Sequence, residues 1–182
     1  MKISEKPLAQ YTWYVRLLLR LQGRKYGRVL KPSLLWARSP LLFLAMGAMF
    51  GALERKRSPL DPVLRSRVMA RVSQINACDF CIDFNSATLA ARAGSTARLP
   101  DERERVALEY AEAMSVNGKS VDHELFAQLS KHFDDDAIVE LTALVAFQNL
   151  SSKFNAALGV PAQGFCEVRE QPNSSERSRG KA

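Results

Sequence analysis

Cysteine and histidine are scarce in this sequence. Its 182 residues include three cysteines and two histidines. So few cysteines, and an odd number of them, exclude the disulfide framework typical of small secreted domains. There is also no second Cys-x-x-Cys and no closely spaced histidine pair of the kind that completes a zinc site. We therefore expect no disulfide scaffold, no bound metal and no cofactor.

Long apolar runs are also lacking. The longest uncharged apolar run, residues 40–53, reads "PLLFLAMGAMFGAL". It is shorter than the ~20 residues that a membrane-spanning helix needs. The N-terminal twenty residues do not have the layout of a signal peptide, because Arg16 and Arg20 interrupt their apolar stretch. We expect a cytoplasmic protein in which residues 40–53 form either a buried helix or a contact between subunits.

Acidic residues are almost absent from the first forty residues. That segment carries nine lysines and arginines against Glu5 alone, whereas the whole chain has a net charge of +7. Basic residues beside aromatic ones can bind nucleic acid or an anionic membrane surface, but no nucleic-acid-binding motif is present. We expect no nucleic-acid partner. The basic side chains should pair with acidic groups of the body or of a neighbouring subunit, with membrane contact of residues 8–22 as the alternative.

Strand-like alternation is nearly absent, and helical spacing dominates. The pattern predicts an all-α protein of about seven helices. Three segments are expected: a basic amphipathic N-terminal extension over 1–39, a helical domain over 40–166 and a disordered polar tail over 167–182. Apolar spacing and start or stop residues place helices at 8–22, with a break from Gly23 to Pro32, and at 40–53, 62–76, 78–94, 101–114, 122–129 and 134–158.

The cysteine pair lies in residues 76–87, which read "NACDFCIDFNSA". Cys78 and Cys81 fall in the first turn of a predicted helix, where unpaired N–H groups and the helix dipole favour a thiolate. Such a position lowers the pKa of a cysteine from ~8.5 towards neutrality. A spacing of three places both sulfurs on one face, within reach of each other. One thiolate can become a sulfenic acid, and the other can condense with it into a disulfide.

The cysteine pair has other interpretations. Burial of two small side chains needs no chemistry. A zinc site would need further ligands from Cys166, His123 and His132, which we instead expect to be an incidental thiol and two surface or capping residues. A thioredoxin-type pair would follow a strand, and none is predicted before residue 76. Asp79 and Asp83 should point to solvent and affect the thiols only weakly.

The helical blocks resemble the alkylhydroperoxidase D-like, carboxymuconolactone decarboxylase superfamily. The resemblance covers about residues 40–165. It rests on "LDPVLRSRVMARVSQINACDFCIDFNSATLAARAG" at 60–94, "ERERVALEYAEAM" at 102–114 and "DDDAIVELTALVAFQNLSSKFNAALGVP" at 134–161. It implies an alkylhydroperoxidase D-like helical bundle with the Cys-x-x-Cys at a helix N-terminus. It also implies subunits that associate as trimers or hexamers.

The resemblance also implies roles for single residues. Cys81 matches the peroxidatic thiol, and Cys78 matches the resolving thiol that closes a redox-active disulfide. An external dithiol protein, of lipoyl or thioredoxin type, would reduce it. The family's proton relay uses a Glu and a His, and these positions hold Ser66 and Asn85. Neither side chain can accept a proton at neutral pH, so we expect polar support from both and weakened peroxidase activity.

Three functions remain open from the sequence. The first is a thiol-dependent oxidoreductase that reduces alkyl hydroperoxides. The second is carboxymuconolactone decarboxylase-like chemistry on a lactone-type acid, against which the retained cysteines argue. The third is a non-enzymatic redox-sensing or scaffold oligomer.

Overall fold

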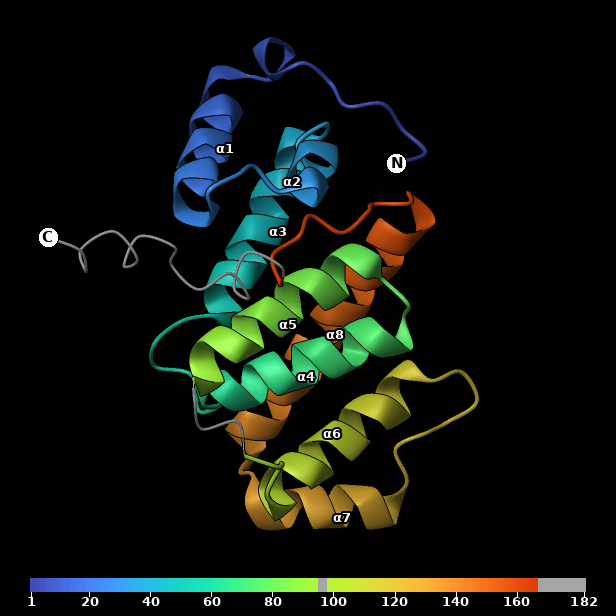
Figure 1. Ribbon diagram of the computed structural model, residues 1–182. Helices are drawn as coiled ribbons and strands as arrows, with labels where there is room; N and C mark the ends of the chain where they lie inside the picture. The colour runs from blue at the N-terminus through green and yellow to red at the C-terminus, as the bar shows by residue number, and fades with distance from the viewer. Residues whose placement is uncertain (95–97, 167–182) are drawn as a thin grey trace, which may run out of the picture.

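The computed structural model describes residues 1–94 and 98–166, and no strand occurs among them (Figure 1). The all-α prediction is confirmed. The predicted tail, 167–182, lies outside the described residues. The elements are a 3₁₀ turn, Leu8–Gln10, and the helices α1 (Trp13–Tyr26), α2 (Lys31–Trp36), α3 (Pro40–Leu53), α4 (Pro62–Ile75), α5 (Asp79–Ala93), α6 (Glu102–Ser115), α7 (His123–His132) and α8 (Asp135–Ala157).

An aspartate caps the start of each of four helices. Each carboxylate accepts a hydrogen bond from a backbone N–H of the first turn, which has no partner inside the helix. At α6 the cap is a full capping box, because Glu104 also reaches back to the backbone N–H of Asp101. The capping residues of α4, α6, α7 and α8 are Asp61, Asp101, Asp122 and Asp134.

The N-terminal helix differs from its predicted bounds. The expected break at Gly23 is wrong, since α1 begins at Trp13 and runs through Gly23 to Tyr26. A Cβ at Gly23 would lie 3.3 Å from Val29 Cγ2, so this glycine accommodates close packing inside the helix. The helix ends instead at Gly27, whose φ of 73° suits a residue without a Cβ.

A short helix, α2, lies where the sequence pattern predicts a break. Pro32 occupies its first turn, where a missing N–H leaves no helical hydrogen bond unmade. Proline therefore starts a helix here rather than interrupting one. With α2 included, the described residues form eight α-helices instead of about seven.

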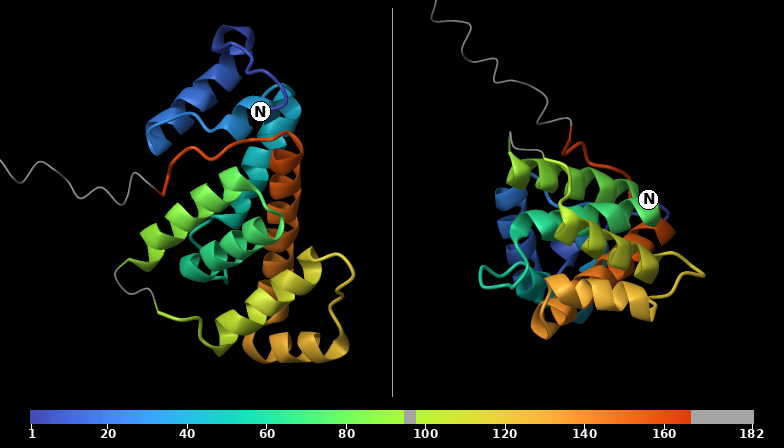
Figure 2. Two further views of the ribbon diagram at one scale, coloured as in Figure 1. Left: turned by 45° about the vertical axis from the view of Figure 1, so that its right-hand side comes forward. Right: turned by 90° about the horizontal axis from the view of Figure 1, so that it is seen from below.

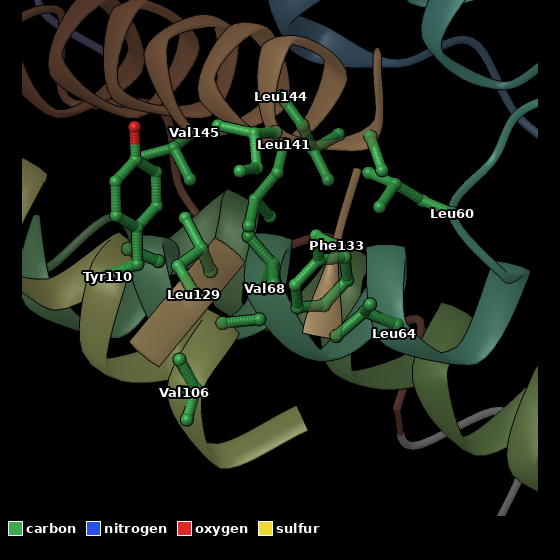
Figure 3. Close-up of a cluster of buried hydrophobic side chains, with 14 of the residues drawn as sticks. Leu60, Leu64, Val68, Val106, Tyr110, Leu129, Phe133, Leu141, Leu144 and Val145 are labelled. Carbon is green, nitrogen blue, oxygen red and sulfur yellow. The ribbon is translucent and has the colours of Figure 1, made fainter. Parts of the chain in front are cut away.

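The main apolar core lies between α4, α6, α7 and α8 (Figure 3). Leu64, Val68, Leu129, Leu141 and Val145 are fully buried there. Burial of each such side chain contributes roughly 1.5–3 kcal/mol to stability. α4 ends just before the cysteine pair, and it is held in place because it packs against α5, α6 and α8.

The ends of the molecule are built from different parts of the chain. α1 and α2 lie together at one end, α6 and α7 lie at the other, and α3, α4, α5 and α8 lie between them (Figures 1 and 2). The segment after α8 returns towards α2 and α5. Residues 1–39 pack on their own chain, since Tyr11, Val15 and Leu19 form a cluster with Ala37 and Phe43.

α3 is the most apolar of the helices, yet most of it is exposed. Leu41 is 78% exposed, and Leu42 and Leu44 are also exposed, whereas Leu53 is buried. The alternative that residues 40–53 form a buried helix is therefore wrong for this chain. A contact between subunits stays a prediction. Within the described residues, no helix is long and apolar enough to cross a membrane.

Candidate redox site

A tight turn joins α4 to α5 and sets the position of the cysteine pair. Ala77 has a φ of 46°, the left-handed conformation that ends many helices. The N–H of Ala77 bonds the carbonyl of Gln74 at 3.0 Å, and the N–H of Cys78 bonds that of Ser73 at 3.2 Å. These two bonds make a Schellman motif. Because Ala77 carries a Cβ, this conformation costs roughly 1–2 kcal/mol.

Cys78 caps the N-terminus of α5, and Cys81 lies in the first turn of that helix. Cys78 Sγ accepts a hydrogen bond from the backbone N–H of Cys81 at 3.3 Å. The two sulfurs form a disulfide, with the Cα atoms 5.2 Å apart. The expectation that the sulfurs lie within bonding reach at a helix start is confirmed.

The two cysteines differ in what they face. Both side chains are buried, but of the two it is Cys81 that lines a cavity of about 390 Å³. α1, α2 and α3 form one side of this cavity, and α4, α5 and α8 form the other. Its lining is mainly apolar and aromatic: Leu21, Gln22, Lys25, Tyr26, Leu30, Pro32, Ser33, Trp36, Phe43, Met46, Gly47, Phe50, Met69, Phe80, Cys81, Phe84, Asn85, Phe147, Gln148 and Ser151.

Asn155 of α8 is the polar side chain that contacts the pair. Its Nδ2 donates a hydrogen bond to Cys81 Sγ at 3.3 Å, and its side chain is fully buried. Its Oδ1 is buried without a hydrogen-bond partner among the described residues. Sequence reasoning missed this residue, and no local signal sets it apart from Asn149 on the same helix.

Asn85, which the resemblance places at a His position, joins a buried polar network beside the cavity. Its Nδ2 donates to Ser73 Oγ at 2.9 Å, and Gln148 Nε2 donates to the same oxygen at 3.1 Å. Ser73 in turn donates to the carbonyl of Met69. Asn85 and Cys81 therefore line one cavity, as expected for residues four apart on a helix.

Ser66, which the resemblance places at a Glu position, lies in a different set of contacts. Its Oγ accepts a hydrogen bond from Arg92 Nη1 at 2.9 Å, and Arg92 also forms a salt bridge with Glu54. Glu54 and Arg92 line a second cavity of about 340 Å³, which Asn85 also lines. The structure thus brings Asn85 to the same cavity as Cys81. Ser66 instead contacts the Arg92–Glu54 ion pair, which the sequence did not reveal.

The prediction that Asp83 points to solvent is wrong, whereas Asp79 is exposed as predicted. Asp83 is buried, because the segment after α8 folds over it. Its carboxylate accepts backbone hydrogen bonds from Gln163 at 2.8 Å and Cys166 at 2.9 Å. Phe165 of this segment packs edge-on against α5. We call residues 160–166 the C-terminal strap, and Asp83 is its anchor.

Asp83→Asn should destabilise the protein by about 1.5–3 kcal/mol, the usual contribution of hydrogen bonds to a charged group. Burial raises the pKa of the Asp83 carboxyl, but backbone hydrogen bonds from residues 163–166 outweigh burial and hold that pKa below its usual value. A carboxyl with a lowered native pKa stabilises the fold above its unfolded pKa of ~3.9. That stability is lost as pH falls through the native value.

Urea unfolding at several pH values tests this prediction. The difference between wild type and Asp83→Asn should be full at pH 6 and shrink below about pH 4. The exposed Asp79→Asn serves as the matched control and should unfold like wild type. An equal stability of both variants at pH 6 would contradict the anchoring role.

The third cysteine and the two histidines, which the sequence offered as possible zinc ligands, lie on other elements than the Cys78–Cys81 disulfide. Cys166 belongs to the strap, and its Sγ bonds the backbone carbonyl of Asp83 at 3.3 Å. His123 begins α7 and is exposed, and His132 ends the same helix. In the part of the chain that the structure describes, no three His, Cys, Asp or Glu side chains gather as metal ligands.

Fold and dithiol together define the class of this protein: an alkylhydroperoxidase D-like helical protein with a Cys-x-x-Cys disulfide at a helix N-terminus. The model of the carboxymuconolactone decarboxylase family matches residues 40–121. The Escherichia coli (strain K12) protein YnjA is 45% identical over 176 residues, which are 91% of this chain and 97% of YnjA. The chain belongs to the carboxymuconolactone decarboxylase family, and the predicted superfamily is confirmed.

Solved structures share the fold. A peroxidase-related protein with an AhpD core from Ralstonia eutropha JMP134 superposes with a TM-score of 0.79 at 23% identity, over 90% of this chain and 93% of that one. The debrominase Bmp8 superposes with a TM-score of 0.71 at 20% identity, over 91% and 97%. At these identities the likeness concerns the fold.

Proposed function

We propose that this protein is a dithiol oxidoreductase that reduces organic hydroperoxides, with Cys81 as the attacking thiol and Cys78 as the resolving thiol. One observation carries the proposal. Of the two sulfurs in the disulfide, that of Cys81 belongs to a residue lining a cavity large enough for a small molecule. Cys78 is buried at the cap of α5, where it needs to reach only its partner.

The proposed cycle balances without a cofactor. The Cys81 thiolate attacks the outer oxygen of R–O–OH, the O–O bond breaks, and the alkoxide takes a proton from water to leave as R–OH. Cys81 is then a sulfenic acid. The Cys78 thiol attacks its sulfur, forming the disulfide and releasing water. An external dithiol resets the pair, and we propose a lipoyl or thioredoxin-type protein for that step.

The described groups can support the thiolate without an imidazole. The N-terminus of α5 presents free N–H groups and the positive end of its dipole. Asn155 donates a further hydrogen bond to Cys81 Sγ. Hydrogen bonds to the charged form lower a pKa. Because Asn85 and Ser66 cannot accept a proton as the relay implied at their positions would, turnover should be about 10²–10⁴-fold slower than with a positioned base.

Asn155→Leu should raise the pKa of the Cys81 thiol by about one unit, because it removes a hydrogen bond to a charged group. The fold should survive, since Asn155 Oδ1 has no partner among the described residues and Leu is of similar size. The pH dependence of Cys81 alkylation by iodoacetamide measures the shift. Asn149→Leu, on the same helix and bonded to Asn76 and Ser115, is the control. An unchanged alkylation profile in Asn155→Leu would remove Asn155 from the mechanism.

The direct test of the function uses the reduced protein and cumene hydroperoxide. We expect a Cys78–Cys81 disulfide, detected by mass spectrometry of peptides, in step with formation of the alcohol. If both thiols remain reduced in a large excess of hydroperoxide, the proposal is wrong.

A second candidate is reductive dehalogenation of an aromatic compound. Seven aromatic side chains line the cavity beside Cys81, and a structural neighbour, Bmp8, is a debrominase whose cysteine variant binds 2,3,4-tribromopyrrole. In this reaction the dithiol supplies two electrons, C–Br becomes C–H, bromide leaves and the disulfide forms. Bromide release from tribromopyrrole by the reduced protein would favour this candidate over peroxide reduction.

We further propose that the chain acts in the cytoplasm as a homo-oligomer, a trimer or hexamer. A reducing compartment keeps a catalytic dithiol available. The exposed apolar residues of α3, Leu41, Leu42 and Leu44, form the kind of surface that subunit contacts cover. Sedimentation equilibrium should give a multiple of the 20.3 kDa chain mass.

A further inference from the structure

A second pocket with a more polar lining adjoins the cavity beside Cys81, and we call the two the polar lobe and the apolar lobe. The apolar lobe measures about 390 Å³ and the polar lobe about 340 Å³. The two share lining residues, among them Lys25, Tyr26 and Asn85. Because the two lobes share these residues, a molecule seated beside Cys81 lies next to a region of different chemistry.

The apolar lobe suits a hydrophobic body. Its walls include Trp36, Phe43, Phe50, Phe80 and Phe147. Burial of apolar substrate surface there yields about 25 cal/mol per Å². Hydrogen peroxide has no such surface and gains nothing from these walls.

The polar lobe carries one positive charge that no carboxylate of the described residues neutralises. Arg92 and Glu54, which line this lobe, form an ion pair with each other. Lys25 lines both lobes, and its Nζ lies 5.1 Å from the centre of the Tyr26 ring. In the part of the chain that the structure describes, no carboxylate lies within salt-bridge distance of Lys25. The net charge of the lobe thus favours a single anionic group.

We propose that the substrates are amphipathic: an apolar body that carries the hydroperoxide and is seated against the aromatic walls, and one carboxylate that binds Lys25 at the polar lobe. The assignment of the reacting group rests on the proposed function. The binding of an apolar carboxylate does not, because it needs neither thiol.

Binding to the oxidised protein separates the two claims, since the disulfide form cannot turn over. Trp36 lines the cavity and Trp13 is exposed, so Trp13→Phe leaves Trp36 as the fluorescent reporter. Decanoate should change its emission with saturation, and decanol should bind more weakly. Lys25→Gln should weaken decanoate binding by about two- to fivefold at low salt and leave decanol unchanged. Arg24→Gln, which removes a neighbouring charge outside the cavity, should leave both unchanged.

A cavity-filling pair of variants tests the site without touching charge. Gly47 of α3 lines the apolar lobe, and a Cβ there meets no atom within 4 Å. Gly47→Leu should fold, because Leu is a better helix former than Gly, and should reduce decanoate binding by tenfold or more. Gly51→Leu, one turn further along α3, also has open space around it and does not line either lobe. It should bind decanoate like wild type.

Each outcome decides between the claims. Equal binding of decanoate and decanol, or an unchanged affinity in Lys25→Gln, would overturn the carboxylate assignment and leave the peroxidase proposal standing. Saturable, Lys25-dependent binding by a protein whose reduced thiols ignore hydroperoxides would support the site and refute the reaction. Binding that Gly47→Leu does not affect would place the ligand elsewhere on the chain.

Discussion

Cys81→Ser should abolish hydroperoxide reduction, whereas Cys78→Ser should still consume one equivalent and then stop as a Cys81 sulfenic acid. The difference follows from the site, in which Cys81 lines the cavity and Cys78 is buried at the cap of α5. Without Cys78 the sulfenic acid has no resolving partner at the site. Only a slower oxidation to the sulfinic acid, by an excess of hydroperoxide, remains open to it.

Stopped-flow mixing with cumene hydroperoxide, followed by dimedone trapping and mass spectrometry, measures both variants. The expected dimedone adduct lies on Cys81 of Cys78→Ser, and steady-state turnover of both variants falls by 10³-fold or more, as is usual when a covalent nucleophile or its partner is lost. Cys166→Ser is the matched control, because that thiol lies in the strap. An adduct on Cys78 in the Cys81→Ser variant would reverse the proposed roles.

Asn85→His should increase the rate of hydroperoxide reduction by on the order of 10²-fold near pH 7.5, the lower end of what a positioned general base contributes. Asn85 follows Cys81 by four residues on α5 and lines the same cavity. An imidazole there can take the thiol proton that Asn cannot. The gain should vanish below about pH 6, where the imidazole is protonated.

The pH profile of the reduction rate distinguishes a base from a merely altered cavity. Ala90→His, placed further along α5 at an exposed position that lines neither lobe, is the control and should leave the rate unchanged. A rise that is independent of pH would contradict general-base action. No rise at all would mean that proton transfer does not limit the reaction.

Much of the fold could be predicted because its signals are local. Asp61, Asp101, Asp122 and Asp134 each cap a helix through contacts two or three residues away. The cysteine spacing likewise predicts a pair at the start of α5. The N-terminal segment was harder, because Gly23 and Pro32 are compatible with helices whenever packing or position in the first turn suits them.

The candidate site was only half predictable. The resemblance to the family pointed to Cys78, Cys81 and Asn85, but not to Asn155, which meets Cys81 from 74 positions away in the chain. A charged side chain considered without its tertiary contacts is expected at the surface. This expectation failed for Asp83, because the backbone N–H groups of the strap needed an acceptor.

By itself, then, the sequence determined where the helices from α3 onward begin and that two thiols share a helix start. It also determined that the described residues form helices, turns and loops. These depend on interactions within a few residues, whose free energies the local sequence sets. Only the tertiary structure decided that α1, α2 and α3 close a cavity over Cys81, that α3 leaves its apolar face exposed, and that Lys25 meets Asn85 at the same lobe. Such contacts join residues far apart in the chain, and they depend on how whole helices pack rather than on any one motif.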